Sequence, residues 1–251
     1  MQALKLLVAG CGYLGLRLTD EQLRLFQVYQ QVLIDWNKKF NLTAVDQPEE
    51  IETRHFLDSL TCFLVFPGVS LVGPSLRDLP SFDELALIDV GAGPGFPGLP
   101  LKIARPGIRL TLIESVGKKT TFLKHVVAQL GMKDVDVVTG RAEDVGRQPG
   151  HREAYDIALA RAVAPLATLA EYCLPFVKVG GRFIAPKKGA IEAELQRAGG
   201  AIDALGGRLT RMQAVEIPDL LEPRFLVVVD KVRPTPPQFP RRAGMPGKKP
   251  L

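Results

Sequence analysis

The sequence predicts an α/β fold, in which a mostly parallel seven-stranded sheet is covered by helices on both faces and preceded by a cap of helices. Two observations support this prediction. From residue 86 onward, short apolar segments alternate with segments whose apolar residues recur at helical spacing, as in chains that connect parallel strands through crossover helices. Between residues 19 and 66 the apolar residues recur at helical spacing only.

The composition is that of an ordinary globular protein. Of the 251 residues, 46% are hydrophobic and 24% are charged, and no apolar run approaches the roughly 20 residues that a membrane-spanning helix needs. The first nine residues contain too short an apolar run for a secretory signal. Cys11, Cys62 and Cys173 are isolated and odd in number, which argues against disulfides and zinc. We therefore expect a cytoplasmic protein that binds neither a membrane nor a metal.

Residues 1–66 predict the helical cap. Thr19 and Gln22 have the spacing of a capping box at the start of one helix, and a second helix is predicted after Pro48. The pattern Gly10-x-Gly12-x-x-Gly15 matches a dinucleotide-binding fingerprint. No second strand follows it before the helix, so the required βαβ unit cannot form. Residues 67–84 are rich in Pro, Gly and Ser, and we expect a linker there.

The α/β domain is predicted at residues 85–232 and a basic, proline-rich tail at residues 233–251. Each predicted strand is a short apolar run, and each predicted helix carries one apolar stripe. The strands are expected at residues 86–90, 109–114, 135–139, 155–160, 181–186, 209–217 and 224–232, and the main helices at 97–104, around 122–130, at 142–145, 166–176 and 191–205.

The glycine-rich stretch after the first strand predicts a ligand site. Asp89-x-Gly91-x-Gly93-x-Gly95 ends the strand, and glycines let a ligand lie against bare main chain. A pyrophosphate would need backbone N–H groups, but Pro94 and Pro97 have none. The stretch instead resembles the first motif of methyltransferases that use S-adenosylmethionine (SAM). A phosphate-bearing nucleotide and a purely structural turn remain as alternatives.

The ends of the next strands add polar residues to the same edge of the sheet, since ligands bind outside the carboxyl ends of parallel strands. Glu114 ends the second strand, where a carboxylate can accept hydrogen bonds from ribose hydroxyls; alternatively it favours the start of the next helix, with Ser115 as its cap. Residues 140–143 follow the third strand, where an adenine could lie. Arg161 follows the fourth and could hold the SAM carboxylate, the acceptor base or a phosphate, or form a structural ion pair.

Polar residues of the cap are weaker candidates. His55 and Asp58 lie three positions apart on a predicted helix and could form a base with its orienting carboxylate. They could equally brace the cap against the core. Asn41 and Thr43, in the preceding loop, have the same two possible roles.

The basic excess of the chain is confined to its end. The formal net charge is +5, and from residue 231 onward there are six basic residues and no acidic one, whereas the first 230 residues contain 26 basic and 27 acidic residues. Such a tail favours either a solubilising role or binding to a polyanion, of which a nucleic acid backbone is the commonest.

Five segments together resemble the bacterial 16S ribosomal RNA guanine-N7 methyltransferases, also called the glucose-inhibited division protein B family. The resemblance runs from about residue 19 to the end, and the Gly-Phe-Pro-Gly-Leu-Pro-Leu form of the glycine loop is its most specific part. Two departures are a long linker at 67–84 and Glu114, where an Asp is frequent. The segments are Asn41-Leu42-Thr43-Ala44, residues 55–60, residues 89–101, residues 161–166 and residues 239–246.

The resemblance implies a Rossmann-like, SAM-dependent enzyme that methylates N7 of one guanosine, position 527 in the customary rRNA numbering, and releases S-adenosylhomocysteine. Its partner would be 16S rRNA, the small subunit or an assembly intermediate, and we expect a monomer. Methylation of a small molecule or protein, or an RNA-binding assembly module with a vestigial SAM site, are the alternatives. The expected cofactor contacts are Asp89, Gly91, Ala92, Gly93, Gly95, Phe96, Glu114, Ser115, Val116, Arg141, Ala142, Glu143 and Arg161.

This chemistry needs no general base, because N7 of neutral guanine carries a lone pair and no proton. Alignment and exclusion of water would then carry the catalysis. We therefore expect Arg161, His55 and Asp58 to hold the guanine edge. The expected RNA contacts are Asn41, Thr43, Lys187, Lys188, Arg241, Arg242, Lys248 and Lys249.

Overall fold

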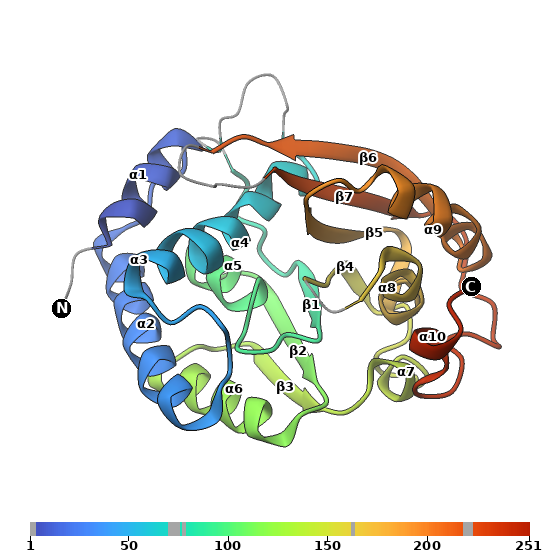
Figure 1. Ribbon diagram of the computed structural model, residues 1–251, viewed down its shortest axis with the longest axis horizontal. Coiled ribbons are helices and arrows are strands. Elements are labelled where there is room, and N and C mark those ends of the chain that lie inside the picture. Colours follow the sequence, from blue (N-terminus) through green and yellow to red (C-terminus); the bar gives the residue numbers. More distant parts are fainter. Residues whose placement is uncertain (1–3, 70–75, 77–78, 162–163, 218–222) are drawn as a thin grey trace.

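The computed structural model describes residues 4–69, 76, 79–161, 164–217 and 223–251. It contains one seven-stranded sheet with the strand order β3-β2-β1-β4-β5-β7-β6, and helices lie on both faces of the sheet (Figure 1). The predicted α/β fold with its helical cap is confirmed. The strands are β1 Ala86–Val90, β2 Arg109–Glu114, β3 Val135–Thr139, β4 Tyr155–Leu159, β5 Val177–Lys188, β6 Gly207–Val215 and β7 Arg224–Lys231.

The strand order reverses beside β1, which is where the functional site is expected. β1 pairs in parallel with β2 on one side and with β4 on the other. The crossover connections therefore leave in opposite directions, and a crevice opens above the carboxyl ends of these strands. β7 is antiparallel to both of its neighbours, so its first residues lie at the same edge of the sheet as the last residues of β5.

Two hydrophobic clusters cover the two faces of the sheet. The cap, α5 and α6 contribute to one cluster, and α8 and α9 contribute to the other. The predicted helix at 166–176 is divided into an α-helix and one 3₁₀ turn, η3. The helices of this part are α5 Gly98–Ala104, α6 Gly117–Gln129, α7 Ala142–Val145, α8 Leu166–Cys173, η3 Leu174–Phe176, α9 Glu192–Ala204 and α10 Met245–Lys248.

The cap begins with α1 (Lys5–Tyr13) and α2 (Asp20–Phe40). The predicted capping box is present, because the Thr19 side chain accepts the Gln22 N–H and the Gln22 side chain accepts the Thr19 N–H. The glycine pattern of residues 10–15 begins inside α1, and a Cβ at Gly10 would collide with Leu57. Gly10 thus permits close helix packing and forms no nucleotide loop.

The second predicted helix begins at Pro48, as expected, and continues without a break to Val65. A π-helical stretch and a final 3₁₀ stretch interrupt its regular hydrogen bonding, and π-helical turns are frequent at functional sites. Its segments are α3 Pro48–Glu50, η1 Ile51–Leu57, α4 Asp58–Leu60 and η2 Thr61–Val65.

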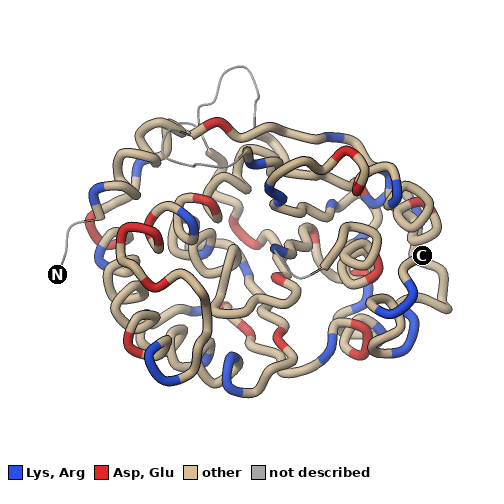
Figure 2. Tube along the Cα trace, in the orientation of Figure 1, with Lys and Arg blue, Asp and Glu red and all other residues tan. Residues whose placement is uncertain are grey.

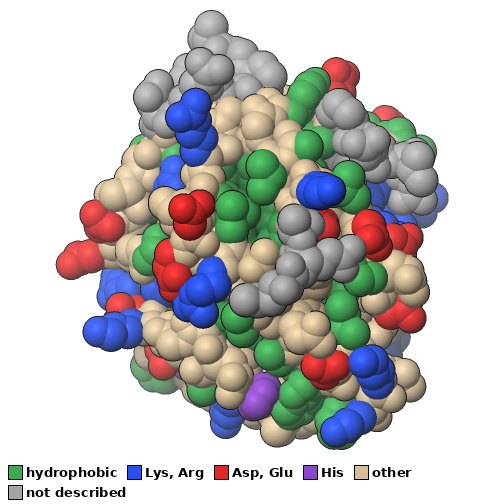
Figure 3. All heavy atoms as spheres, turned by 90° about the vertical axis from the view of Figure 1, so that its left-hand side faces the viewer, with side chains coloured by type: hydrophobic (Ala, Val, Ile, Leu, Met, Phe, Trp, Pro, Cys, Tyr) green, Lys and Arg blue, Asp and Glu red, His purple; other side chains and the backbone are tan. Residues whose placement is uncertain are grey.

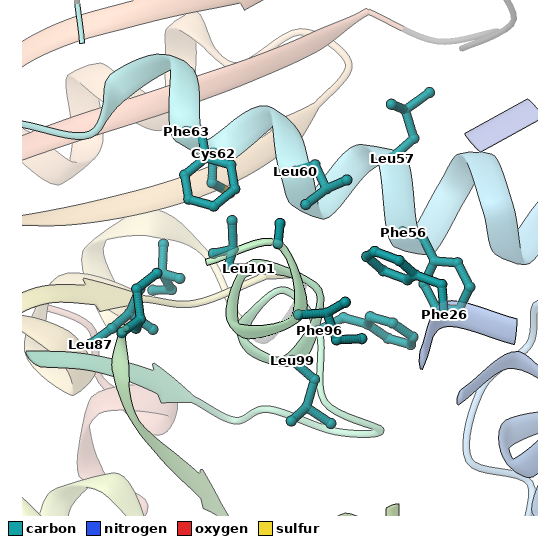
Figure 4. Close-up of a cluster of buried hydrophobic side chains, with 14 of the residues drawn as sticks. Phe26, Phe56, Leu57, Leu60, Cys62, Phe63, Leu87, Phe96, Leu99 and Leu101 are labelled. Atoms are coloured by element: carbon teal, nitrogen blue, oxygen red, sulfur yellow. The ribbon is translucent and has the colours of Figure 1, made fainter. Parts of the chain in front are cut away.

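The cap shares one core with the sheet domain. Phe96, which belongs to the glycine loop, lies beside Phe56 of η1 and near Phe26 of α2 in the close-up of this cluster (Figure 4). The rings of Phe26 and Phe56 have centroids 4.9 Å apart, and those of Tyr29 and Phe96 are 5.3 Å apart and stacked. This aromatic contact fixes the position of the glycine loop against the cap.

Described residues of the predicted linker also pack on the protein. The Leu76 side chain is buried and its N–H donates to the carbonyl of Leu14, and Phe82 stacks on Phe63 with centroids 5.9 Å apart. Residues 70–75, 77 and 78 of the predicted linker lie outside the described residues.

On the face that carries the cap, basic and acidic side chains are interspersed (Figure 3).

Candidate functional site

Two pockets open at the carboxyl edge of the sheet and share Ala164 and Pro165. The first has a volume of about 380 Å³ and the second about 690 Å³, both within the roughly 300–1,000 Å³ of small-molecule sites. The first pocket is lined by Val90, Gly91, Ile113, Glu114, Ser115, Gly140, Arg141, Ala142, Glu143, Ala164, Pro165, Thr168, Tyr172, Gly247 and Pro250. The second is lined by Val45, Arg54, His55, Asp58, Arg161, Ala164, Pro165, Pro186, Lys187, Lys188, Glu194, Arg197 and Arg224.

Glu114 binds two loops that each contribute to the first pocket, one after β1 and one after β2. One carboxylate oxygen accepts the Gly93 N–H at 3.0 Å, and the other accepts the Val116 N–H at 2.9 Å. The side chain is nearly buried but lines the pocket. A carboxylate oxygen has room for a second hydrogen bond, so Glu114 can hold the loops and still accept from a hydroxyl in the pocket.

Asp89 does not line the pocket, although it was expected to contact the cofactor. Its carboxylate is fully buried, and one oxygen accepts the Gly98 N–H at 2.8 Å, which secures the start of α5. The other oxygen has no hydrogen-bond partner among the described residues. Burial raises the pKa of Asp89 to about 7, and the nearby Glu114 adds to this effect.

Asp89→Asn should change how stability depends on pH. Because the pKa of Asp89 is raised in the folded state from 3.8 to about 7, the stability gained from its protonation is complete below pH 3.8 and is lost as pH rises through 7. Asn cannot ionise. We expect the free energy of unfolding of the variant, relative to the unmodified protein, to increase between pH 4 and pH 8 by no more than roughly 4 kcal/mol.

Denaturant unfolding at several pH values measures this difference. Asp144→Asn, at an exposed carboxylate on α7, is the control and should show no comparable rise. A difference for Asp89→Asn that stays flat from pH 4 to pH 8 would contradict the expectation.

Gly95 permits the contact between the glycine loop and the cap. Its φ is +103°, and a Cβ there would meet Leu99 and would lie 2.6 Å from the Tyr29 hydroxyl. That buried hydroxyl donates to the carbonyl of Pro94. We expect Gly95→Ala to lower the free energy of unfolding by roughly 1–3 kcal/mol through strain and crowding.

Gly12→Ala is the matched control for this substitution. Gly12 lies in α1 with nothing within 4 Å of its ideal Cβ, so alanine should raise helix stability by up to about 1 kcal/mol. If thermal unfolding shows the same change in stability for Gly95→Ala and Gly12→Ala, the glycine loop has room for a Cβ at residue 95, and the expectation is wrong.

Arg161 lines the second pocket and joins the cap to the sheet. Its guanidinium donates to Asp58 at 2.6 Å and to His55 Nδ1 at 3.2 Å, and it lies over the ring of Phe96 at 5.2 Å. The other oxygen of Asp58 accepts from Arg224 Nε at 3.1 Å. Asp58 therefore holds two arginines at one wall of the pocket.

His55 is neutral in this arrangement. Burial and the adjacent Arg161 lower its pKa to about 3. Nδ1 lies 3.2 Å both from Arg161 Nη2 and from the carbonyl of Arg54, and Nε2 lies 2.9 Å from Thr43 Oγ1. Because arginine can only donate, Nδ1 accepts from Arg161 when the proton is on Nε2, and Nε2 then donates to Thr43. The imidazole stacks on Phe96 with centroids 4.3 Å apart. Thus His55 is a neutral imidazole at neutral pH and lies within hydrogen-bond distance of Arg161.

The other expected cofactor contacts differ in whether they line the first pocket. Arg141 and Ser115 line the first pocket and are exposed, whereas Val116 is exposed beside it. Ala92, Gly93, Gly95 and Phe96 lie in the glycine loop and are not among the residues that line either pocket.

The expected RNA contacts are also divided. Lys187 is paired with Glu194 at 2.7 Å, and Lys188 is exposed at the rim of the second pocket. Asn41 is exposed and ends α2 in the left-handed conformation, with φ 48°.

The tail departs most from its expected role. The sequence predicted that the tail binds a polyanion or acts as a solubilising segment, whereas in the structure Gly247 and Pro250 line the first pocket. Arg241 is bound to the buried carboxylate of Glu171 at 2.6 Å, which occupies the guanidinium. Arg242, Lys248 and Lys249 are exposed, and Lys and Arg gather around α10 and the C-terminus (Figure 2).

Some residues of the site were not predicted from the sequence. Arg224 could have been found, because a basic residue at the start of an antiparallel strand falls at the carboxyl edge of its parallel neighbours. Thr168 and Tyr172 lie one helical turn apart on α8 and line the first pocket, but this spacing is common in helices. Gly247 and Pro250 carry no sequence signal of their own.

The first pocket fits SAM on its own geometry. A positive φ of 72° brings the bare backbone of Gly91 to the pocket wall. Glu114 offers a carboxylate to hydroxyls, and Tyr172, Pro250 and Ala142 offer apolar surface to a purine.

Comparisons with known proteins agree with this geometry. The family model described as "GidB: rRNA small subunit methyltransferase G" matches residues 22–221. "Ribosomal RNA small subunit methyltransferase G" of Roseiflexus castenholzii is 53% identical over 94% of this chain and 95% of its own length. The protein of the same name from Alkaliphilus metalliredigens is 43% identical over 100% of both chains.

Proposed function

Because the chain belongs to the family of rRNA small subunit methyltransferase G, we propose that it transfers a methyl group from SAM to N7 of one guanosine of 16S rRNA. The family predicted from the sequence motifs is confirmed. The observation that supports this function best is the pair of pockets that share Ala164 and Pro165. One pocket suits the methyl donor, and the other, which is basic, suits the nucleotide that accepts the methyl group.

The first pocket would hold SAM, whose sulfonium supplies the electrophilic methyl group. Glu114 would accept from the ribose hydroxyls, and Gly91 would present bare backbone. Ala142 and Glu143, at the start of α7, would lie at the adenine, with Ser115 and Arg141 beside them. Asp89, Gly93 and Gly95 would act indirectly, since they fix the loop that forms the pocket.

The second pocket would hold the guanosine and its phosphates. Six of its lining residues are Lys or Arg and two are acidic, so the pocket attracts a phosphodiester. Arg161, Arg224 and Lys188 line this pocket and would bind the guanine edge or the adjacent phosphates. A donor placed on N7 itself would block the reaction, so the arginine must bind elsewhere on the base or its phosphates.

His55 and Asp58 act in this proposal as positioning residues. A neutral imidazole and a carboxylate fix both ends of the Arg161 guanidinium, and no proton has to be removed from guanine N7. Alignment of the lone pair with the methyl group and exclusion of water then account for catalysis. Asn41, Thr43, Lys187, Arg242, Lys248 and Lys249 remain proposed contacts for a larger RNA surface. We propose a cytoplasmic monomer.

Incubation of the protein with labelled SAM and small ribosomal subunits that lack the modification tests this function. We expect label in 16S rRNA, and nucleoside analysis should recover it as 7-methylguanosine. Parallel reactions with naked 16S rRNA and with the protein fraction identify the acceptor. Label found only in protein, or only in another nucleoside, would contradict the proposal.

A further inference from the structure

Residues 233–251, called the strap from here on, fold back across the sheet domain, so that α10 lies beside α7 and α8 (Figure 1). The first half of the strap is fixed by Arg152, whose guanidinium donates to the carbonyls of Phe239 at 2.8 Å and Thr235 at 2.7 Å. Thr235 is buried. The strap is therefore part of the folded domain from its beginning.

A buried ion pair fixes the second half. The Arg241 guanidinium and its backbone N–H both donate to Glu171 of α8, at distances between 2.6 and 3.1 Å. The Glu171 side chain is only 1% exposed. Two-point, charge-assisted bonds to a buried carboxylate are among the strong hydrogen bonds in proteins, and leaving that carboxylate unpaired would be costly.

Beyond Arg241 the strap binds to residues that themselves line the first pocket. Glu143 Oε1 accepts the Gly244 N–H at 2.8 Å, and Thr168 Oγ1 donates to the carbonyl of Pro246 at 3.2 Å. Glu143 and Thr168 are nearly buried and line the pocket. The strap thus holds two pocket side chains in place.

The strap also supplies pocket surface directly. Gly247 and Pro250 line the first pocket, and the ideal Cβ position of Gly247 lies 3.5 Å from the Tyr172 hydroxyl. A Cβ there would be in ordinary van der Waals contact with this hydroxyl, and the two further methyl groups of a valine would take up more of the space at this wall. The apolar ring of Pro250, which lines the same pocket as Tyr172, is the kind of surface that a purine covers.

We propose that residues 241–250 are the closing wall of the cofactor pocket, at the side of Glu143 and Tyr172, and that docking of the strap and binding of SAM stabilise each other. This inference rests on the proposed function for the identity of the ligand. Coupling must be reciprocal: a strap that is released weakens SAM binding, and bound SAM protects the strap.

The adjacent residues Arg241 and Arg242 provide a matched test. Arg241→Ala removes the bond to Glu171, whereas Arg242→Ala changes an exposed side chain. Calorimetry with SAM should show a Kd roughly tenfold higher for Arg241→Ala and an unchanged Kd for Arg242→Ala. Gly247→Val, which crowds the wall, should weaken binding by a similar factor, and Ala243→Val, at an exposed position, should not.

Proteolysis gives a second readout. Trypsin can cleave after Arg242 and Lys248, both exposed in the strap, and SAM should slow this cleavage in the unmodified protein but not in Arg241→Ala. Equal SAM affinity in both matched pairs, with cleavage that SAM does not change, would overturn the inference while the proposed function stands. If the unmodified protein binds no SAM, both fail.

Discussion

Arg161→Ala should reduce methyl transfer to the small subunit to near background, with kcat/KM lower by roughly 100-fold or more. Arg161 is the residue on which the second pocket depends, since it binds Asp58 and His55 and covers Phe96. Its loss removes a cation from the acceptor side and leaves Asp58 paired with Arg224. The sequence predicted that Arg161 also contacts the cofactor, but the structure places it in the second pocket and not among the residues that line the first. We therefore expect SAM affinity to stay within about twofold of the original value.

Loss of methyl transfer with SAM affinity retained distinguishes a positioning role at the acceptor from a merely structural ion pair. Calorimetry with SAM, thermal unfolding and transfer rates would be measured on the same preparation, with Arg208→Ala, an exposed residue of β6, as the control. Near-normal turnover by Arg161→Ala would refute the role. Parallel loss of SAM binding and thermal stability would indicate that the ion pair only maintains the fold.

Glu114→Ala should weaken SAM binding, which Arg161→Ala is expected to leave unchanged. The substitution removes the acceptor of the Gly93 and Val116 N–H groups together with the carboxylate that faces the pocket. An unpaired buried donor costs about 1–3 kcal/mol, and a lost bond to a charged group costs a similar amount. We expect the Kd for SAM to rise by roughly 100-fold.

Glu114→Asp and Glu114→Gln give graded controls for this prediction. Aspartate retains the charge on a shorter stem, so we expect it to retain SAM binding to within about tenfold. Glutamine retains one acceptor oxygen and should fall between aspartate and alanine. If alanine binds SAM as well as glutamate does, the ribose does not depend on this carboxylate and the proposed orientation of the cofactor is wrong.

The sequence predicted the sheet well because the α/β pattern is local. Each strand from 86 to 159 is a short apolar run followed by a helix, and this alternation indicates both the parallel sheet and the edge at which ligands bind. The same rule placed Glu114 and residues 140–143 at one pocket, where the structure has them.

Contacts between distant segments could not be predicted in this way. Arg224 and Asp58 are 166 positions apart and meet because the cap, β7 and the loop after β4 converge. A carboxylate near the end of a strand can face the pocket, as Glu114 does, or be buried at the start of α5, as Asp89 is, and the apolar pattern of the strands did not distinguish the two. The charge of the tail was visible, but Glu171, the partner that occupies Arg241, gave no sign in the sequence.

Mapping the methylated nucleotide tests the central claim most directly. Small subunits that lack the modification would be incubated with labelled SAM and the unmodified protein, and their 16S rRNA would be cleaved selectively at 7-methylguanosine. We expect a single cleavage site, at position 527 in the customary numbering, that disappears with Arg161→Ala. Methylation spread over many guanosines, or none in 16S rRNA at all, would contradict it.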